Sequence, residues 1–193
     1  MSSSCPSIET PVTPEPSSRL TLPLEAFYRR SGLPLPVLSP VEGAAVPRPY
    51  RDLLVHQRDM TPTLESFHGE RIVLRLLGKH VGADRLDREV VLTLEASGRA
   101  VEFGAIAIHL QAFPEAARAE IAGCRTPLGT ILTKHGVQHL SRPDAFFSLE
   151  SDSAIEAVLE MRAPARLYGR HNFLTTPDGR LLADVLEILP PVD

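Results

Sequence analysis

The sequence has few of the features that define secreted, disulfide-bonded and membrane proteins. Its two cysteines, Cys5 and Cys124, lie far apart in a chain of 193 residues. A structural disulfide is therefore not expected, and a reducing, cytoplasmic location is. The longest apolar run falls short of the roughly 18 residues that a membrane-spanning helix needs, so no contact with a membrane is expected. The first residues lack the charged and apolar regions of a signal peptide.

Positive charge and cofactor motifs are also scarce. Twenty Lys and Arg against 24 Asp and Glu give a formal net charge of −4 at pH 7, so no nucleic-acid surface is expected. The sequence contains no Gly-rich phosphate loop and no GxSxG elbow. His135 and His139 are four residues apart, but no acidic residue or cysteine accompanies them at a zinc-like spacing. We therefore expect a protein that works without a metal or cofactor.

The remaining composition predicts one domain behind a proline-rich segment. Apolar residues make up 43% of the chain, which is typical of a globular protein. Residues 1–18 are rich in Ser, Pro, Thr and Glu and are predicted to be a disordered tail. Residues 19–49 are predicted to form a proline-rich strap with a short helix over 20–30, and residues 50–193 the domain.

Alternating apolar residues within this domain predict an antiparallel sheet. Strands are expected over 69–80, 86–95, 101–110, 137–149, 165–175 and 180–189, and short helices over 50–56, 61–67, 114–122, 127–134 and 153–161. In the second of these helices Thr61 is the expected N-cap. Short turns join the strands 86–95 and 101–110 and the strands 165–175 and 180–189 into two hairpins. The pattern predicts an α+β fold with the helices clustered on one side of the sheet.

The strand 86–94 provides the first candidate site residue. One face is expected to be core and the other half-solvated; the core face carries Arg88, Val90, Leu92 and Leu94, and the other Glu89, Val91, Thr93 and Glu95. A guanidinium on an inward face stays charged and needs an anion. Two roles for Arg88 are therefore open. It is a structural group, which pairs with a core carboxylate or extends to the strand end, or it anchors a ligand carboxylate in an enclosed pocket.

The final strand shows the same irregularity. Each of its faces is apolar and carries one carboxylate, Glu187 on one face and Asp184 on the other, and one face is expected to meet solvent. A buried, unpaired carboxylate is costly and its pKa rises. Glu187 is therefore either half of a structural ion pair with a core arginine or an acid–base group.

Two further segments suggest anion binding. In TPLG, residues 126–129, the threonine suits an N-cap and the proline the first helical position. The amides of Leu128 and Gly129 would then face an anion with the helix dipole behind them, unless this is an ordinary capped helix. Arg170, in a polar stretch of the strand 165–175, is either a second anion ligand or an exposed strand residue.

Five short motifs occur together in a specific order. They are RDMT (58–61), REVVL (88–92), TPLGTIL (126–132), YGRHNFL (168–174) and EILP (187–190). With this order and spacing, residues 53–190 resemble the chorismate pyruvate-lyase family, also called 4-hydroxybenzoate synthases. The resemblance implies one antiparallel sheet of about six strands, with helices and flap segments enclosing an internal ligand cavity. It also implies a cofactor-independent lyase that releases pyruvate from chorismate to give 4-hydroxybenzoate, for ubiquinone or aromatic secondary-metabolite biosynthesis. We expect a monomer or small homo-oligomer.

The resemblance also implies roles for individual residues. Arg88 and the Leu128 amide would hold the ring carboxylate, Glu187 would lie at the other end of the ring and assist proton movement, and Met60 would close the flap. Arg88 and Glu187 are thus the catalytic candidates. The other substrate-binding candidates are Gly129, Arg170 and Arg58.

The sequence departs from this family in two places. The last motif is one residue shorter than usual, which leaves the register of Glu187 open, with Asp184 as the alternative. Residues 102–105 (EFGA) stand where lyases tend to carry a second arginine, and Glu102 becomes a further inward acid. Two alternatives therefore stay open. One is a non-catalytic protein of the same fold that binds a small aromatic carboxylate, since related domains serve as ligand sensors in transcription regulators. The other is a lyase for a chorismate-related substrate.

Overall fold

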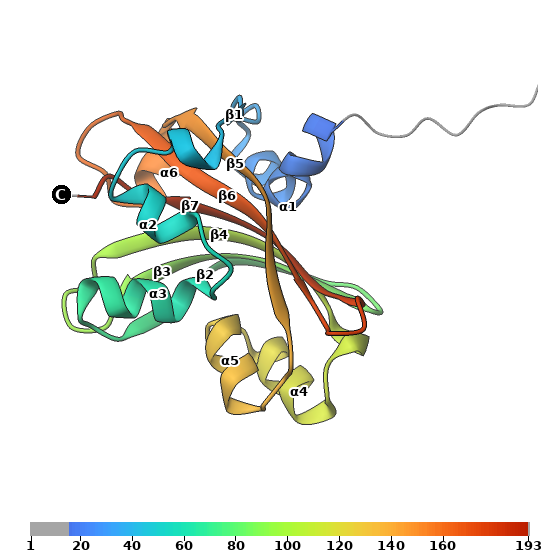
Figure 1. Cartoon of the computed structure of the whole chain (residues 1–193). Helices are drawn as coiled ribbons and strands as arrows, with labels where there is room; N and C mark the ends of the chain where they lie inside the picture. Colours follow the sequence, from blue (N-terminus) through green and yellow to red (C-terminus); the bar gives the residue numbers. More distant parts are fainter. Residues whose placement is uncertain (1–15, 193) are drawn as a thin grey trace, which may run out of the picture.

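The computed structural model describes residues 16–192, built on a single antiparallel sheet (Figure 1). Residues 1–15, most of the predicted tail, lie outside the described part. The sheet has seven strands in the order β1-β5-β6-β7-β4-β3-β2. These strands are β1 (Ser39–Pro40), β2 (Ile72–Val81), β3 (Arg85–Leu94), β4 (Ala100–His109), β5 (Leu140–Glu150), β6 (Arg166–Thr175) and β7 (Leu181–Leu189). The predicted α+β fold and its six long strands are confirmed, and β1 adds a short seventh.

Two hairpins meet in the middle of the sheet. The predicted pairs β3–β4 and β6–β7 both form, and β4 pairs with β7 to join them. In this central pairing Gly104 lies opposite Glu187 and Ile106 lies opposite Val185. On the far side of β7, Glu187 lies opposite Arg170. The register therefore brings residues from four separate stretches of sequence into adjacent rows.

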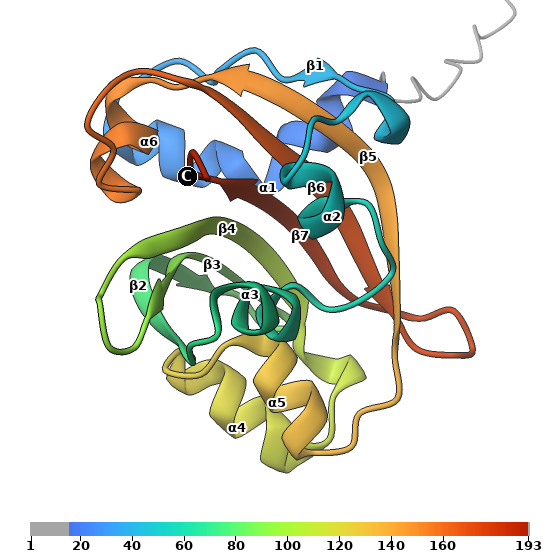
Figure 2. The ribbon, with the colours of Figure 1, turned by 60° about the vertical axis from the view of Figure 1, so that its left-hand side comes forward.

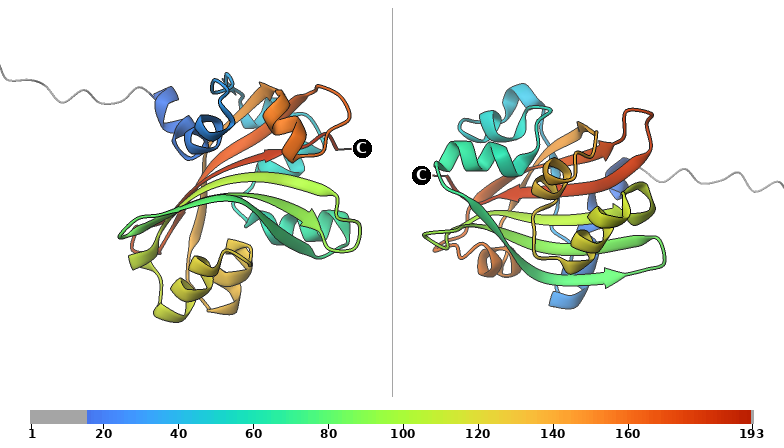
Figure 3. Two further views of the ribbon diagram at one scale, coloured as in Figure 1. Left: turned by 180° about the vertical axis from the view of Figure 1, so that it is seen from behind. Right: turned by 90° about the horizontal axis from the view of Figure 1, so that it is seen from below.

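Helices cover both faces of the sheet, which corrects the expectation that they cluster on one side. The helices α2 (Tyr50–Leu54), α3 (Met60–His68), α4 (Glu115–Gly123) and α5 (Leu128–Lys134) pack on one face, around which the sheet curves (Figure 2). The helices α1 (Pro16–Ser31) and α6 (Ser153–Val158) cover the other face (Figure 3). Two short 3-10 turns, η1 (Gly43–Ala45) and η2 (Leu110–Ala112), complete the set. None of the described helices is long and apolar enough to cross a membrane.

The helix α1 explains why two predictions of solvent exposure are wrong. It begins at Pro16, inside the predicted tail, and its Phe27 packs against Phe103 of the central strand β4. The β3 face that was expected to be half-solvated is therefore buried, with Glu89 only 2% exposed. Arg30 of α1 donates hydrogen bonds to both carboxylate oxygens of Glu89 and neutralises it. Both faces of β7 are likewise covered.

The same covered face contains a second charged cluster. The ring of His171 is fully buried and its Nε2 lies 2.6 Å from Asp184 Oδ1, while Nδ1 lies 3.4 Å from Asp144 Oδ2. Burial alone would lower the pKa of His171, but the hydrogen bonds and charges of the two carboxylates outweigh it and raise that pKa. Asp184 thus has a structural partner on the face away from α3 and α5. Of the two carboxylates of the final strand, it is Glu187 that lies on the face covered by these helices.

Two helix starts differ by one or two residues from the predicted ones. The N-cap of α3 is Asp59 rather than Thr61, and the N-cap of α5 is Pro127 rather than Thr126. The Thr126 hydroxyl instead donates to Glu120 at 3.0 Å. Neither cap residue makes a side-chain capping bond, and the Asp59 carboxylate is free to contact a residue elsewhere in the chain.

Candidate functional site

A cavity lies between the sheet and the N-terminal ends of α3 and α5. Its wall is mainly apolar and comes from five strands and the two helix starts; the apolar members from the strands are Leu74, Val90, Leu92, Ile106, Leu174 and Val185. The polar members are Asp59, Thr61, Arg88, Glu102, Asn172 and Glu187. A mainly apolar pocket with a few convergent polar groups is the usual form of a small-molecule site.

Arg88 is a buried cation with unused hydrogen-bond donors. It lies on β3 and is 1% exposed. Its Nη2 donates to the carbonyl of Thr126 at 3.4 Å, whereas Nε and Nη1 have no acceptor among the described residues. Burial lowers the pKa of the Arg88 guanidinium, and the neighbouring Cys124 thiol opposes this effect in part. An arginine nevertheless stays protonated in proteins, so a positive charge with two free donors faces the cavity.

Two helix N-termini meet beside this cation. Leu128 and Gly129, the residues of the predicted amide pair, begin α5 and line the cavity. The first amides of a helix have no intrahelical acceptor and carry the positive end of its dipole. At Gly129 an added Cβ would lie 3.4 Å from Thr61 Oγ1, which shows how closely the start of α3 approaches α5. Arg88 and these helix ends bring positive charge to this end of the cavity, where Asp59 also approaches Gly129.

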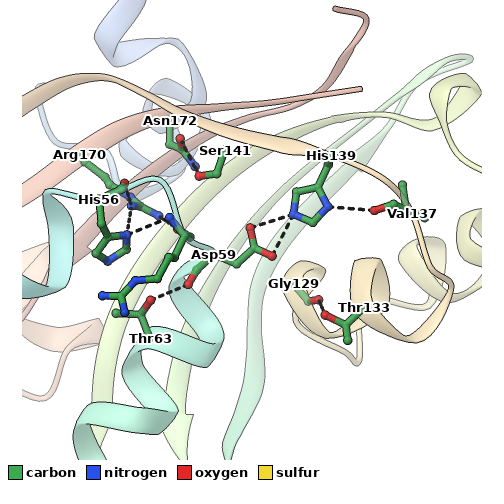
Figure 4. Close-up of polar contacts among 11 residues, drawn as sticks. His56, Asp59, Thr63, Gly129, Thr133, Val137, His139, Ser141, Arg170 and Asn172 are labelled. Carbon is green, nitrogen blue, oxygen red and sulfur yellow. Dashed lines mark hydrogen bonds and ion pairs between the residues drawn. The ribbon is translucent and has the colours of Figure 1, made fainter. Parts of the chain in front are cut away.

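Glu187 lies on the same wall and is paired from behind. Its carboxylate accepts a short hydrogen bond from Arg170, which is fully buried. Arg170 also donates to the carbonyls of Leu54, His56 and Arg58, all at 3.3 Å. Figure 4 shows Arg170 beside His56. Arg170 thus lies behind Glu187 rather than on the cavity wall.

Glu102 is the second acid on this part of the wall. It is 3% exposed, and its Oε2 is buried with no hydrogen-bond partner among the described residues. Burial raises the pKa of Glu102 well above its ordinary value, the Glu187 charge raises it further, and Arg170 offsets part of the shift. Burial and the Glu187 charge therefore favour the protonated, neutral form of the Glu102 carboxyl.

A short segment, residues 54–61, runs from the end of α2 into the first turn of α3, and its last three residues line the cavity. Met60 is buried at its end and lines the cavity, as the resemblance implies. Asp59 also lines the cavity, and its two carboxylate oxygens lie 2.9 and 3.0 Å from Nε2 of His139 (Figure 4). This hydrogen bond raises the pKa of His139, against a smaller opposing effect of burial. The pair fixes the start of α3 to the chain that leads into β5.

The same segment contains a neutral histidine. His56 Nδ1 lies 3.3 Å from Arg170 Nη1 and accepts from the Arg58 amide at 3.2 Å. Burial, followed by the charges of Arg170 and Arg58, lowers the pKa of His56 to about 4. His56 therefore acts as an acceptor that helps to hold the segment.

The structure brings five of the seven predicted site residues to one cavity. Those on its wall are Arg88, Glu187, Met60, Leu128 and Gly129. Arg170 is buried behind the wall, and the exposed Arg58 borders two surface depressions outside it. Sequence reasoning did not select Asp59, Asn172 or His139. Asp59 lies within the motif 58–61 and Asn172 alternates with Arg170 along β6, so two of the three had a local signal.

The comparisons with known proteins show a fold. No family model matches the sequence, and no curated protein matches it. A gene product from Staphylococcus aureus subsp. aureus N315 has a similar structure with a TM-score of 0.53 and 8% identity, covering 71% of this chain and 90% of that one. The possible transcriptional regulator YydK from Bacillus subtilis subsp. subtilis str. 168 matches with a TM-score of 0.51 and 12% identity, covering 90% of this chain and 78% of that one.

A third structure is less similar. The effector domain of PhnF from Mycobacterium smegmatis has a TM-score of 0.46 and 18% identity, over 68% of this chain and 87% of that one. Together with the observed topology, the first two structures place the chain in the chorismate-lyase-like fold. The fold is shared by lyases and by ligand-binding domains of regulators, so it does not by itself define an activity.

Proposed function

We propose that the chain binds a small aromatic monocarboxylate in the cavity between the sheet and the starts of α3 and α5. The observation that carries this proposal is Arg88, a buried cation with two unpaired donors beside two helix N-termini. Leaving a buried charged donor unpaired is costly, so such a group is kept where a ligand completes it. A carboxylate accepts two parallel hydrogen bonds from a guanidinium, and the apolar wall suits an aromatic ring.

The charges on the wall favour one negative charge in the ligand rather than two. Arg88 is the only basic side chain among the described residues that line the cavity. Of the three acids there, Asp59 has His139 as its partner and Glu187 has Arg170. Chorismate carries two carboxylates, and the second would find no free cation on this wall. Ala105, in the stretch where the resemblance implies a second arginine, lies in the apolar cluster of the opposite face.

A ligand of this size requires the cavity to widen. Its volume is about 50 Å³, whereas a cavity of roughly 150 Å³ holds benzene. The segment 54–61, whose last three residues line the cavity, does not belong to the sheet. Side-chain contacts with Arg170 and the Asp59–His139 pair hold it in place. Its outward movement would admit the ring.

Binding without turnover is also the role that one structure of the same fold suggests, since YydK is described as a possible transcriptional regulator. The second candidate is a lyase acting on chorismate or a relative. It is favoured by Arg88, Leu128, Glu187 and Met60, which line one cavity as the family resemblance implies. It would use Glu187 as the acid–base group.

Titration of the purified chain with benzoate tests the proposal. Saturation at about 100 times Kd should stabilise the fold by about 2.7 kcal/mol, which for a domain of this size raises Tm by about 5–11 °C. Benzamide, which has the same shape without the charge, is the matched control ligand and should give no comparable shift. An equal shift from both ligands, or none from benzoate, would contradict the proposal. Pyruvate release from chorismate would instead establish the lyase.

A further inference from the structure

Glu102 presents a buried carboxyl group to the cavity that no described contact explains. It lies opposite Leu92 in the β3–β4 pairing, four residues along β3 from Arg88. Four strand residues span roughly 13 Å, so the acid and the cation lie toward opposite ends of the cavity. Both side chains line the cavity, and once the cavity has widened a substituted ring would lie between them. Asp59 and Glu187, the other acids on the wall, already have basic partners.

The backbone next to Glu102 leaves room for its carboxyl group. Gly104 is two residues further along β4, on the same face, between Val90 and Glu187 in the sheet. A Cβ at Gly104 would lie 3.3 Å from Glu102 Oε1 and 3.2 Å from Val90 Cγ2, closer than side chains normally pack. Glycine at this position thus allows the Glu102 carboxyl to lie across the sheet toward Glu187.

The surroundings of Glu102 differ from those of Glu187. Glu187 has the direct ion pair with Arg170. Burial and the neighbouring Glu187 charge both oppose the ionisation of Glu102, and they raise its pKa. A neutral carboxylic acid has one O–H donor, which a carboxylate lacks. The same arrangement, a carboxylic acid kept neutral by its site in order to donate, is known in enzyme oxyanion holes.

We propose that Glu102, as a neutral acid, donates a hydrogen bond to an acceptor oxygen at the end of the ligand opposite its carboxylate. This inference rests on the proposed function and narrows its ligand class. The ligand is a benzoate with an ether, hydroxyl or carbonyl oxygen in the para position, and a second carboxylate at that position is excluded. Glu102 thereby selects among ligands that Arg88 alone would accept equally.

Three para-substituted probes test this inference on the full chain by calorimetry. 4-Methoxybenzoate offers an acceptor, 4-methylbenzoate offers none, and benzene-1,4-dicarboxylate places a charge there. The wild type should bind the methoxy probe roughly 3–10-fold more tightly than the methyl probe, the range expected of one hydrogen bond. It should bind the dicarboxylate at least about tenfold more weakly than the methoxy probe, since no cation faces that end.

Two variants assign the preference to Glu102. Glu102→Leu removes the donor at similar size and should abolish the preference for methoxy over methyl. Glu102→Gln keeps a neutral donor and should retain the preference, which guards against a packing effect in the leucine variant. Glu95→Leu makes the same chemical change directly after β3, where the side chain is 53% exposed, and should leave all ratios unchanged.

The outcomes separate this inference from the proposed function. If the wild type binds benzoate but its methoxy-to-methyl ratio is near one, or is the same in Glu102→Leu, the inference is wrong and the proposed function stands. If the wild type binds none of the benzoates, both fail. A preference lost in Glu102→Leu and retained in Glu102→Gln supports the inference.

Discussion

Replacing Arg88 by methionine should stabilise the fold while it removes ligand binding. Methionine keeps an unbranched apolar chain in place of the arginine stem, so the packing within β3 is largely preserved. The charge and the two unpaired donors disappear with the guanidinium. A residue retained only for packing would behave in the opposite way, because a large-to-small core substitution destabilises.

The size of both effects can be worked out from the site. A buried charged donor left without a partner costs about 1–3 kcal/mol, and removing it returns that amount. In a domain of this size Tm then rises by about 2–12 °C. Binding loses the charge-assisted bonds to the ligand carboxylate, about 2–4 kcal/mol, which is roughly 30- to 1000-fold in Kd. Arg88→Lys should recover only part of that affinity, because the two-pronged guanidinium geometry is lost.

Thermal unfolding and calorimetric titration with benzoate measure the two effects on the same samples. Arg71→Met is the matched control, since Arg71 precedes β2 and its side chain is 83% exposed. The control should melt and bind as the wild type does. An Arg88→Met protein that melts lower than wild type and binds benzoate equally well would refute the reasoning and make Arg88 a structural group.

Three further predictions concern the fold. Burial lowers the pKa of His171, but Asp184 outweighs burial and raises that pKa in the folded protein. The protonated histidine therefore stabilises the fold most below the unfolded-state pKa of histidine, about 6.5. That contribution is lost as pH rises through the higher folded pKa, and His171→Gln should flatten the profile in urea unfolding from pH 5 to 9. Gly169→Ala would place a methyl group against the backbone carbonyl oxygen of Glu187 and the Phe147 ring, and should cost about 1–3 kcal/mol or more in unfolding free energy. Asp152→Ala removes the side chain that caps α6 and should cost about 1 kcal/mol.

Each of these predictions has a contrary outcome. Stability that rises between pH 6 and 9, and does so less in His171→Gln, would reverse the assigned direction of the shift. An unchanged melting temperature in Gly169→Ala would mean that β5 and β6 separate more easily than their pairing indicates. For the cap, Asp152→Asn should retain most of the stability, and a loss as large as that of alanine would point to the charge instead.

The strand pattern predicted the sheet and one half of the site because both depend on alternation. Arg88 was assigned to an inward face because it alternates with apolar neighbours. Both faces of the final strand are apolar, so Glu187 was selected from the family resemblance instead, and both residues line the cavity. Parity is a local property that survives small errors in strand boundaries, since residues two apart stay on one face. The exact strand partners were not needed for this part of the prediction.

Contacts between distant residues could not be predicted in the same way. Glu89 was assigned to a half-solvated face because its partner, Arg30, lies 59 residues away on a helix with no sequence signal for its docking site. Arg170 was considered as an anion ligand, and its anion proved to be Glu187, directly opposite on β7. Whether an inward charged side chain pairs with a ligand or with another side chain depends on the order of the strands in the sheet. The alternation of apolar residues carries no information on that order.

The contacts of Arg170 have a consequence for how variants of Glu187 are to be interpreted. One guanidinium holds both the cavity carboxylate and the carbonyls of residues 54–58. Neutralising Glu187 leaves a buried positive charge without its counter-ion and loosens the segment 54–61. A loss of activity or affinity in Glu187→Gln therefore has two possible causes, a lost contact with the ligand and a loosened segment 54–61. Comparing the double variant Glu187→Gln/Arg170→Gln with each single variant separates the two causes.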